Sequence, residues 1–171
     1  VNPFYYLSQM DEAISSCQKS LEVLSSQGRA SHPDFATSLN NLGVNYKARG
    51  DYAKAEEYYL RALEIQRIVL GESHPDFASS LNNLAINYSD QGDYAKAEEY
   101  NLRALEIRRS VLGESHPDFA RNLNNLATNY GDQGDYAKAE EYYLRALEIK
   151  RSALGESHPD FASSLNNLAI N

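Results

Sequence analysis

The sequence repeats itself at a fixed interval, and no other feature constrains its fold as strongly. The hexapeptide Ser-His-Pro-Asp-Phe-Ala occurs four times at intervals of 42 residues, starting at Ser31, Ser73, Ser115 and Ser157. Residues 74–115 and 116–157 differ at only seven positions. A unit this short cannot bury an apolar face by itself, so neighbouring units are expected to stack on one another.

The repeat divides the chain into complete and partial units. Residues 32–73, 74–115 and 116–157 are complete repeats. Residues 1–31 form a partial repeat that is expected to hold mainly a second helix, and residues 158–171 correspond to the first helix of a further repeat. Both ends fall inside a unit and the first residue is not methionine, so we expect the sequence to be part of a longer array.

The first half of each unit is predicted to be a helix. In the repeat 74–115, Ser73 is expected to cap a helix that has a proline in its first turn and Asp76 near its positive end. Apolar residues then recur with helical spacing and form one face: Leu81, Leu84, Ala85 and Tyr88. Gly92 is expected to end the helix, because glycine readily takes the left-handed conformation of a helix C-terminus.

The second half of each unit is predicted to be another helix. Asp93 is expected to cap it, and the Leu112-Gly113 pair is expected to end it. Glu99 and Arg103 lie four residues apart in the order that favours an ion pair on a helix surface. No segment has the alternating pattern of a β-strand, so the fold is predicted to be all-α.

The pattern of small and aromatic residues resembles the tetratricopeptide repeat (TPR). The residues that carry this resemblance are Leu42-Gly43, Tyr46, Gly50, Tyr52, Ala55, Tyr59 and Ala62, and then Leu84-Ala85, Tyr88, Gly92, Tyr94, Ala97, Asn101 and Ala104. The 42-residue period, with its Leu-Asn-Asn-Leu-Ala core, is similar to the variety found in kinesin light chains. The resemblance implies a right-handed α-solenoid of stacked antiparallel helix pairs. It also implies a non-catalytic scaffold that binds a peptide or helix in a concave groove.

Two consecutive asparagines in each first helix are the main candidates for ligand binding. A helical wheel places them opposite the apolar face, and the resemblance implies that this side lines the groove. An amide offers both a donor and an acceptor, as a peptide backbone does. The leading candidates are the second members, Asn41, Asn83, Asn125 and Asn167, followed by the first members, Asn40, Asn82, Asn124 and Asn166. The alternative is that these amides brace the next helix.

Positions that vary among repeats on this side are candidates for ligand selection. They include Lys47, Asp90, Arg121 and Asp132, and most differences between the second and third complete repeats fall on or beside this side. A surface that selects a partner shows this pattern. A solvated surface whose residues change freely after duplication shows it as well.

Charge and composition exclude several other functions. The formal net charge of −8 disfavours nucleic acid and anionic membranes as partners, because both require clustered basic residues. The single cysteine, Cys17, permits no internal disulfide and fits a reducing, cytoplasmic setting. Adjacent Ser, His and Asp residues at a helix start do not converge as a catalytic triad does. We therefore predict no catalytic residues, no metal site and no cofactor.

Two other functions remain open from the sequence. Leu165, Leu168 and Phe161 are expected to be exposed, because no second helix covers residues 158–171. One end of the chain is therefore expected to complete the other in a head-to-tail assembly. Alternatively, the array is the sensor module of a larger signalling ATPase or enzyme whose catalytic residues lie in other domains.

Overall fold

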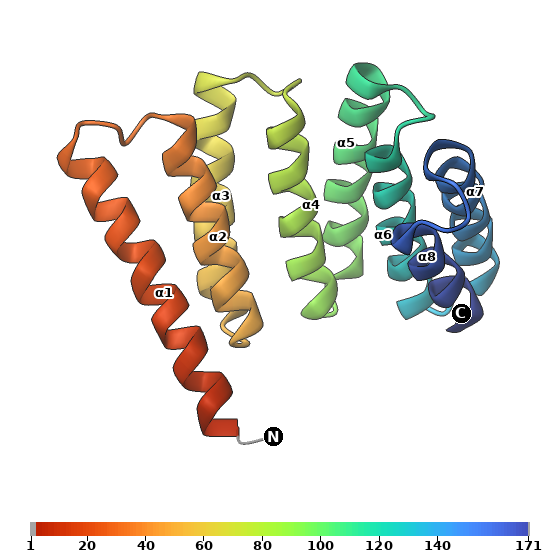
Figure 1. The fold of residues 1–171 in the computed structure, drawn as a ribbon, viewed down its shortest axis with the longest axis horizontal. Helices are drawn as coiled ribbons and strands as arrows, with labels where there is room; N and C mark the ends of the chain where they lie inside the picture. The colour runs from red at the N-terminus through yellow and green to blue at the C-terminus, as the bar shows by residue number, and fades with distance from the viewer. Residues whose placement is uncertain (1–2, 171) are drawn as a thin grey trace. The chain divides into compact units, whose positions relative to one another are not determined.

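The computed structural model describes residues 3–170, which are almost entirely helical and contain no β-strand. Eight helices lie in this range (Figure 1): α1 (Pro3–Ser26), α2 (Pro33–Ala48), α3 (Tyr52–Val69), α4 (Pro75–Asp90), α5 (Tyr94–Leu112), α6 (Pro117–Asp132), α7 (Tyr136–Leu154) and α8 (Pro159–Ile170). The chain divides into two compact units, residues 1–87 and 88–171. The prediction of an all-α fold built from repeated helix pairs is confirmed.

The first helix of each repeat is capped by histidine, and the predicted serine cap is wrong. In α2 the ring Nδ1 of His32 accepts a hydrogen bond from the Asp34 amide at 3.2 Å. In α6 the Nδ1 of His116 accepts from the Asp118 amide at 3.1 Å. Proline occupies the first helical position, so the residue before it, histidine, is the N-cap and serine lies one residue too far out.

The second helix of each repeat begins as predicted, and α5 ends at the predicted Leu112-Gly113 pair. Asp51, Asp93 and Asp135 accept hydrogen bonds through their carboxylates from the backbone amides three residues later, at 3.2 to 3.3 Å. Gly92 has a φ of 79°, which is the left-handed conformation that ends α4, and Gly113 has a φ of 80° after α5. Glycine takes this conformation without the steric cost that a Cβ atom adds.

In the first unit, α2 packs against both α1 and α3. Its core contains Phe35, Ala36 and Leu39 of α2 with Ala62 of α3, and Leu21 and Leu24 of α1 pack against this cluster. Gly43 of α2 meets the ring of Tyr59, and a Cβ atom at Gly43 would lie only 2.6 Å from that ring. The small residue that the repeat pattern requires here therefore makes room for a fully buried tyrosine.

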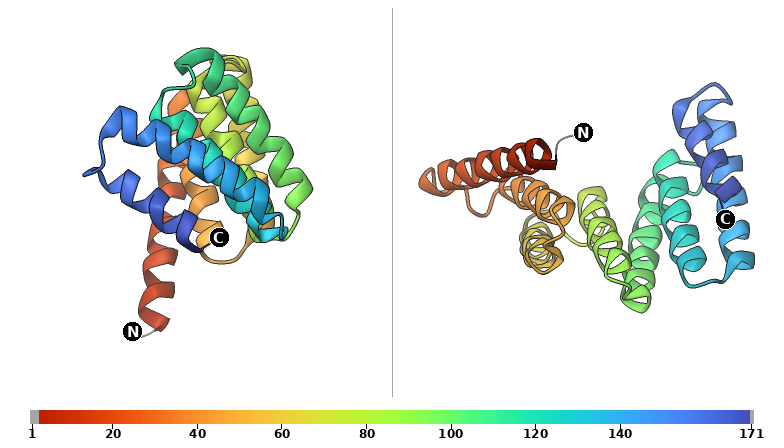
Figure 2. Two further views of the ribbon diagram at one scale, coloured as in Figure 1. Left: turned by 90° about the vertical axis from the view of Figure 1, so that its right-hand side faces the viewer. Right: turned by 90° about the horizontal axis from the view of Figure 1, so that it is seen from below.

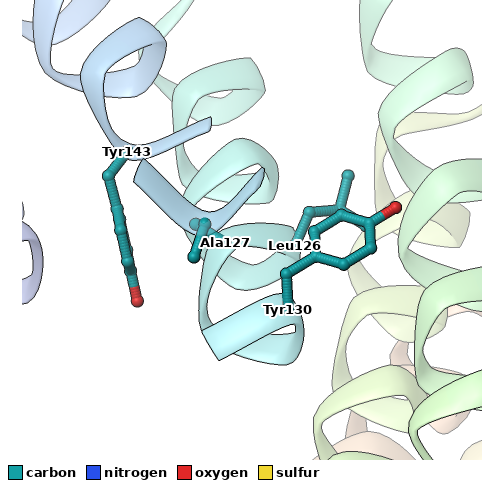
Figure 3. Packing of buried hydrophobic residues seen from close by; sticks show 5 residues of the cluster. Leu126, Ala127, Tyr130 and Tyr143 are labelled. Carbon is teal, nitrogen blue, oxygen red and sulfur yellow. The ribbon is translucent and has the colours of Figure 1, made fainter. Parts of the chain in front are cut away.

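In the second unit, α6 packs against α5 and α7, and α8 packs against α7 (Figure 2). The Tyr143 ring of α7 lies beside Ala127 of α6, while the Tyr130 ring points toward the other side of α6 (Figure 3). The expectation that three apolar side chains of α8 are exposed is wrong for two of them. Phe161 is buried and Leu168 is half-buried because α8 packs on its neighbours, and only Leu165 is exposed.

Candidate partner-binding face

The first helices share a stripe of positions that point away from their buried face. In α2 these are Thr37, Asn41, Val44 and Ala48, all of them exposed. They follow one another by three or four residues, which keeps them on one side of a helix. Together with their equivalents we call them the first-helix stripe: Ser79, Asn83, Ile86 and Asp90 in α4, Arg121, Asn125, Thr128 and Asp132 in α6, and Ser163 and Asn167 in α8.

Asparagine is the constant residue of the first-helix stripe. Asn41 is exposed, and Asn83, Asn125 and Asn167 are half-buried. The position four residues before the asparagine is threonine, serine or arginine, and the position three residues after it is valine, isoleucine or threonine where the stripe is complete. In each of these helices the second asparagine is therefore at least partly exposed among residues that change from repeat to repeat.

The first asparagine of each pair lies in a different environment. The amide nitrogen of Asn40 donates to the hydroxyl oxygen of Ser80 at 2.6 Å. Asn124 donates in the same way to Ser164 at 2.9 Å. Asn82 and Asn124 are only 7% exposed, and Asn166 at the last first helix is exposed. The bonds of Asn40 and Asn124 join successive first helices, which is the bracing alternative that the sequence left open.

A long polar side chain from the second helix reaches the same buried place. The Lys150 ammonium of α7 donates to the Ser164 hydroxyl at 2.8 Å and to the Asp160 carbonyl oxygen at 3.3 Å. One repeat earlier, the Arg108 guanidinium of α5 donates to the Asn122 side-chain oxygen and to the Asp118 carbonyl oxygen. Gln66 holds the equivalent position in α3 and is also buried.

We call these groups the junction sets, because each joins one repeat to the next. They are Asn40 and Ser80 at the first junction, Arg108 and Asn122 at the second, and Asn124, Lys150 and Ser164 at the third. Gln66 is buried at the position that corresponds to Arg108 and Lys150. The repeat pattern by itself did not predict the junction sets. The sequence does contain a signal, because the two almost identical repeats 74–115 and 116–157 differ at these positions: Arg108 corresponds to Lys150, and Ser80 corresponds to Asn122.

Burial shifts the acid–base behaviour of both junction cations. The pKa of Arg108 falls below its ordinary value to about 10, mainly because burial disfavours the charged guanidinium and secondly because Arg121 repels it. The pKa of Lys150 is also lowered, first by burial and against the attraction of the Asp160 carboxylate. These cations bond to carbonyl, amide and hydroxyl oxygens, so they hold helices together rather than face solvent.

A third asparagine fixes each first helix to the preceding repeat. The Asn87 side-chain nitrogen donates to the Tyr52 carbonyl oxygen at 3.1 Å, and Asn129 donates to the Tyr94 carbonyl oxygen at the same distance. Asn87 is fully buried. It also lies in an Asn-Tyr-Ser sequence that resembles a glycosylation site, but its side chain is inaccessible to a modifying enzyme. The sequence does not predict these hydrogen bonds, because the spacing of an asparagine from the apolar face does not show which carbonyl oxygen of another helix its side chain reaches.

The variable residues predicted to select a ligand are accessible to different degrees. Asp90, Arg121 and Asp132 are exposed, and Lys47 is half-buried. The Ser89 hydroxyl donates to the Asp132 carboxylate at 3.4 Å, which joins the ends of α4 and α6. Arg121 forms an ion pair with Asp118 of its own helix at 3.2 Å. The predicted ligand-binding roles of all these residues, and of the asparagines, remain predictions.

The described surface also has hollows, and these lie along the second helices. Two of them occupy about 290 and 320 Å³ and have matching linings one repeat apart. Their shared positions are Leu102, Leu105, Glu106, Arg109, Glu114 and Phe119 in one hollow and Leu144, Leu147, Glu148, Arg151, Glu156 and Phe161 in the other. A third, of about 370 Å³, contains Glu114 and Arg145, which form an ion pair at 2.7 Å. Sequence reasoning did not predict these hollows.

No group of three or more histidine, cysteine, aspartate or glutamate side chains within residues 3–170 is arranged to hold a metal ion. None of the helices in this range has the length and apolarity that crossing a membrane requires.

Comparison with known families identifies the repeat. The family model described as tetratricopeptide repeat matches residues 4–68, 34–110, 76–152 and 118–171. The chain belongs to the tetratricopeptide repeat family. The fold is accordingly that of a TPR solenoid of stacked antiparallel helix pairs, and TPR proteins are in general non-catalytic interaction scaffolds.

Solved structures show that this TPR array is of the kinesin-light-chain-like kind. It is similar to BtubC (BKLC) from P. vanneervenii, with 33% identity and a TM-score of 0.77 over 89% of this chain and 60% of that one. It is also similar to the nearly identical TPR-like repeats of a putative kinesin light chain from Podosopora anserina. There the identity is 25% and the TM-score 0.76, over 96% of this chain and 78% of that one.

A curated relative matches a smaller part of the array. The heat shock protein sti1 homolog of Schizosaccharomyces pombe is 37% identical over 67 residues, which cover 37% of this chain and 11% of the relative. The TPR array thus spans about a tenth of that protein's length and 60% of BtubC.

Proposed function

We propose that this TPR array is a non-catalytic scaffold that binds an extended peptide or a helix of another protein along its first-helix stripe. The observation that carries the proposal is the arrangement of the stripe, in which one accessible asparagine per first helix lies among positions that vary. Family membership supports the general role of a protein-interaction scaffold, and the stripe supports the location.

The chemistry of the stripe suits recognition of a peptide backbone. Each asparagine amide can donate to a backbone carbonyl and accept from a backbone N–H group, whatever the side chains of the ligand are. Affinity would therefore come from the repeated amide, while residues such as Arg121 and Asp132 would favour particular side chains or charges. The first asparagines take part less, because Asn40 and Asn124 are engaged in the junction sets.

The proposal is tested with a peptide selected from a random library against the wild-type array. The variant Asn83→Ala with Asn125→Ala is expected to bind that peptide about 10- to 30-fold more weakly, because each lost hydrogen bond contributes about 1 kcal/mol. Isothermal titration calorimetry gives the Kd, and circular dichroism confirms that the variant keeps its helical content and melting temperature.

A matched variant tests the competing location along the second helices. Leu102 and Leu144 are 41% and 48% exposed and line the two matching hollows. Leu102→Ser with Leu144→Ser is expected to leave the Kd unchanged. Loss of binding in this variant, with full binding retained by the asparagine variant, would place the ligand in the hollows and contradict the proposal.

Head-to-tail self-association is the second candidate. The surface that supports it is on α8, where Leu165 is 44% exposed. Light scattering over a concentration series distinguishes it from peptide binding by a monomer. A constant molar mass up to high concentration would rule it out. The role of sensor module in a larger signalling protein stays a proposal that the full gene sequence decides.

A further inference from the structure

The junction sets place different polar chemistry at otherwise equivalent interfaces. At the third junction, three helices each contribute one side chain, and the Ser164 hydroxyl of α8 accepts from both Asn124 of α6 and Lys150 of α7. At the second junction, a guanidinium of α5 bonds to an amide oxygen of α6 instead. The first junction has Gln66 in the position of these cations.

The pairs are matched by hydrogen-bonding chemistry. The ammonium of Lys150 is a compact donor, and it meets the small hydroxyl of Ser164. Arg108 has a broad, planar guanidinium, and it meets the longer amide side chain of Asn122, which extends an oxygen toward it. Both arrangements also use a backbone carbonyl oxygen of the next first helix, that of Asp160 or Asp118.

Burial makes a wrong pairing costly. Arg108 and Lys150 are 1% and 6% exposed, and Asn122 and Ser164 are fully buried. A buried cation that loses its acceptor keeps its desolvation cost, and a side chain that is too large for a packed interface is also destabilising. A second helix placed on the wrong first helix would therefore leave polar atoms unsatisfied or crowded.

Such discrimination is needed because the rest of the interface is almost identical. The second and third complete repeats differ at seven positions, and three of these, Arg108/Lys150, Ser80/Asn122 and Ser79/Arg121, lie at or beside a junction. The apolar contacts alone would also allow a second helix to pack on the first helix of a different repeat, within one chain or between two copies. Buried polar residues are known to fix register in other helical assemblies at some cost in stability.

We infer that the junction sets specify register: arginine at position 108 selects the first helix with asparagine at the acceptor position, α6, over first helices with serine there, whereas lysine at position 150 selects a serine-bearing first helix, in the same chain or in a second copy. The interaction surface is the buried side of α5 or α7, and the partner that fits it is a first helix with the matching acceptor, asparagine for arginine and serine for lysine.

A double-mutant cycle tests the pairing in the full chain. Arg108→Lys and Asn122→Ser are made singly and together, which copies the chemistry of the third junction into the second. Each single variant is expected to raise the unfolding equilibrium constant. The unfolding equilibrium constant of the double variant is expected to be about tenfold smaller than the product of the two single effects predicts. Urea titration measures this, and Arg109→Lys, at the exposed neighbouring position, is the control with no expected change.

A second readout separates register from simple stability. The double variant has two identical junctions, so refolding from urea at increasing protein concentration is expected to give a larger oligomeric fraction than the wild type gives. Size-exclusion chromatography with light scattering measures that fraction. The reciprocal variant, Lys150→Arg with Ser164→Asn, is expected to behave in the same way.

Two results would overturn the inference. Additive single effects, within about twofold, would show that the partners are not matched. A clear coupling without any rise in oligomers for either double variant would show that the sets stabilise the junctions but do not specify their register.

Discussion

Three asparagine positions that recur in α2, α4 and α6 have different roles, although they lie within six residues of sequence. In α2 the first lies toward the next repeat, where Asn40 donates to Ser80, and the second, Asn41, is exposed. The third is turned toward the preceding repeat, where Asn87 binds the Tyr52 carbonyl oxygen. Because each residue turns the side chain by 100°, sequence neighbours serve different interfaces.

Two buried asparagines should respond to the same substitution with opposite sign. Asn87→Leu removes a bond to a backbone carbonyl and is expected to lower the free energy of unfolding by about 1–3 kcal/mol. Asn101 is 2% exposed, and its side-chain oxygen has no hydrogen-bond partner among residues 3–170. Asn101→Leu is expected to raise the free energy of unfolding by about 1 kcal/mol, because an unsatisfied buried amide is replaced by an apolar group of similar size.

Urea unfolding followed by circular dichroism measures both effects. Asn129→Leu serves as the control for Asn87→Leu, since it breaks the equivalent bond to the Tyr94 carbonyl oxygen. Equal destabilisation by all three substitutions would contradict the prediction and show that Asn101 is satisfied in solution.

At the scale of the element, the two helices of a repeat are capped by different chemistry. First helices use a histidine ring before proline, and second helices use a carboxylate three residues from the amide that it binds. In α3 and α5 the carboxylate caps are expected to respond to acid. Hydrogen bonds from the Lys54 backbone lower the pKa of Asp51, and bonds from the Lys96 side chain and backbone lower the pKa of Asp93.

Acid should therefore weaken α3 and α5. The folded-state pKa of each aspartate lies below its ordinary value of 3.8, so the unfolded chain binds more protons between the two values. The resulting stability is present above the ordinary pKa and is lost as the pH falls through the folded-state pKa. Asp51→Asn with Asp93→Asn keeps a capping oxygen that does not titrate. Its urea midpoint is expected to fall less steeply below about pH 4 than the wild-type midpoint does. Identical slopes would contradict the assignment.

At the scale of the whole molecule, packing within each unit joins elements that are close in the sequence. In the first unit α1 packs on α2 and α2 on α3, and in the second unit α5 to α8 pack in succession. Stability in such an array is a sum of repeat and neighbour terms, so a local defect need not spread.

A defect in the last described helix should stay local. Phe161 of α8 is 8% exposed, and Phe161→Ala removes an apolar side chain whose loss costs about 3–5 kcal/mol. Hydrogen exchange followed by mass spectrometry is expected to show faster exchange in α8 and unchanged protection in α2 and α3. Faster exchange in all helices together would show that the array unfolds as one cooperative body instead.

The sequence by itself determined the fold, because the period, the apolar spacing and the glycine and proline positions are local properties of the chain. It predicted the ends of the helices in the repeat 74–115 closely, and it missed the histidine cap because serine is the commoner one. Tertiary structure alone decided what the polar residues do. Asn40 and Asn41 are adjacent residues of the same type. Only the packing of the next first helix shows that Asn40 binds Ser80 and that Asn41 stays at the surface. Arg108 and Lys150 look like surface cations in the sequence, and only the stacking of the next repeat buries them and gives them oxygens to bind.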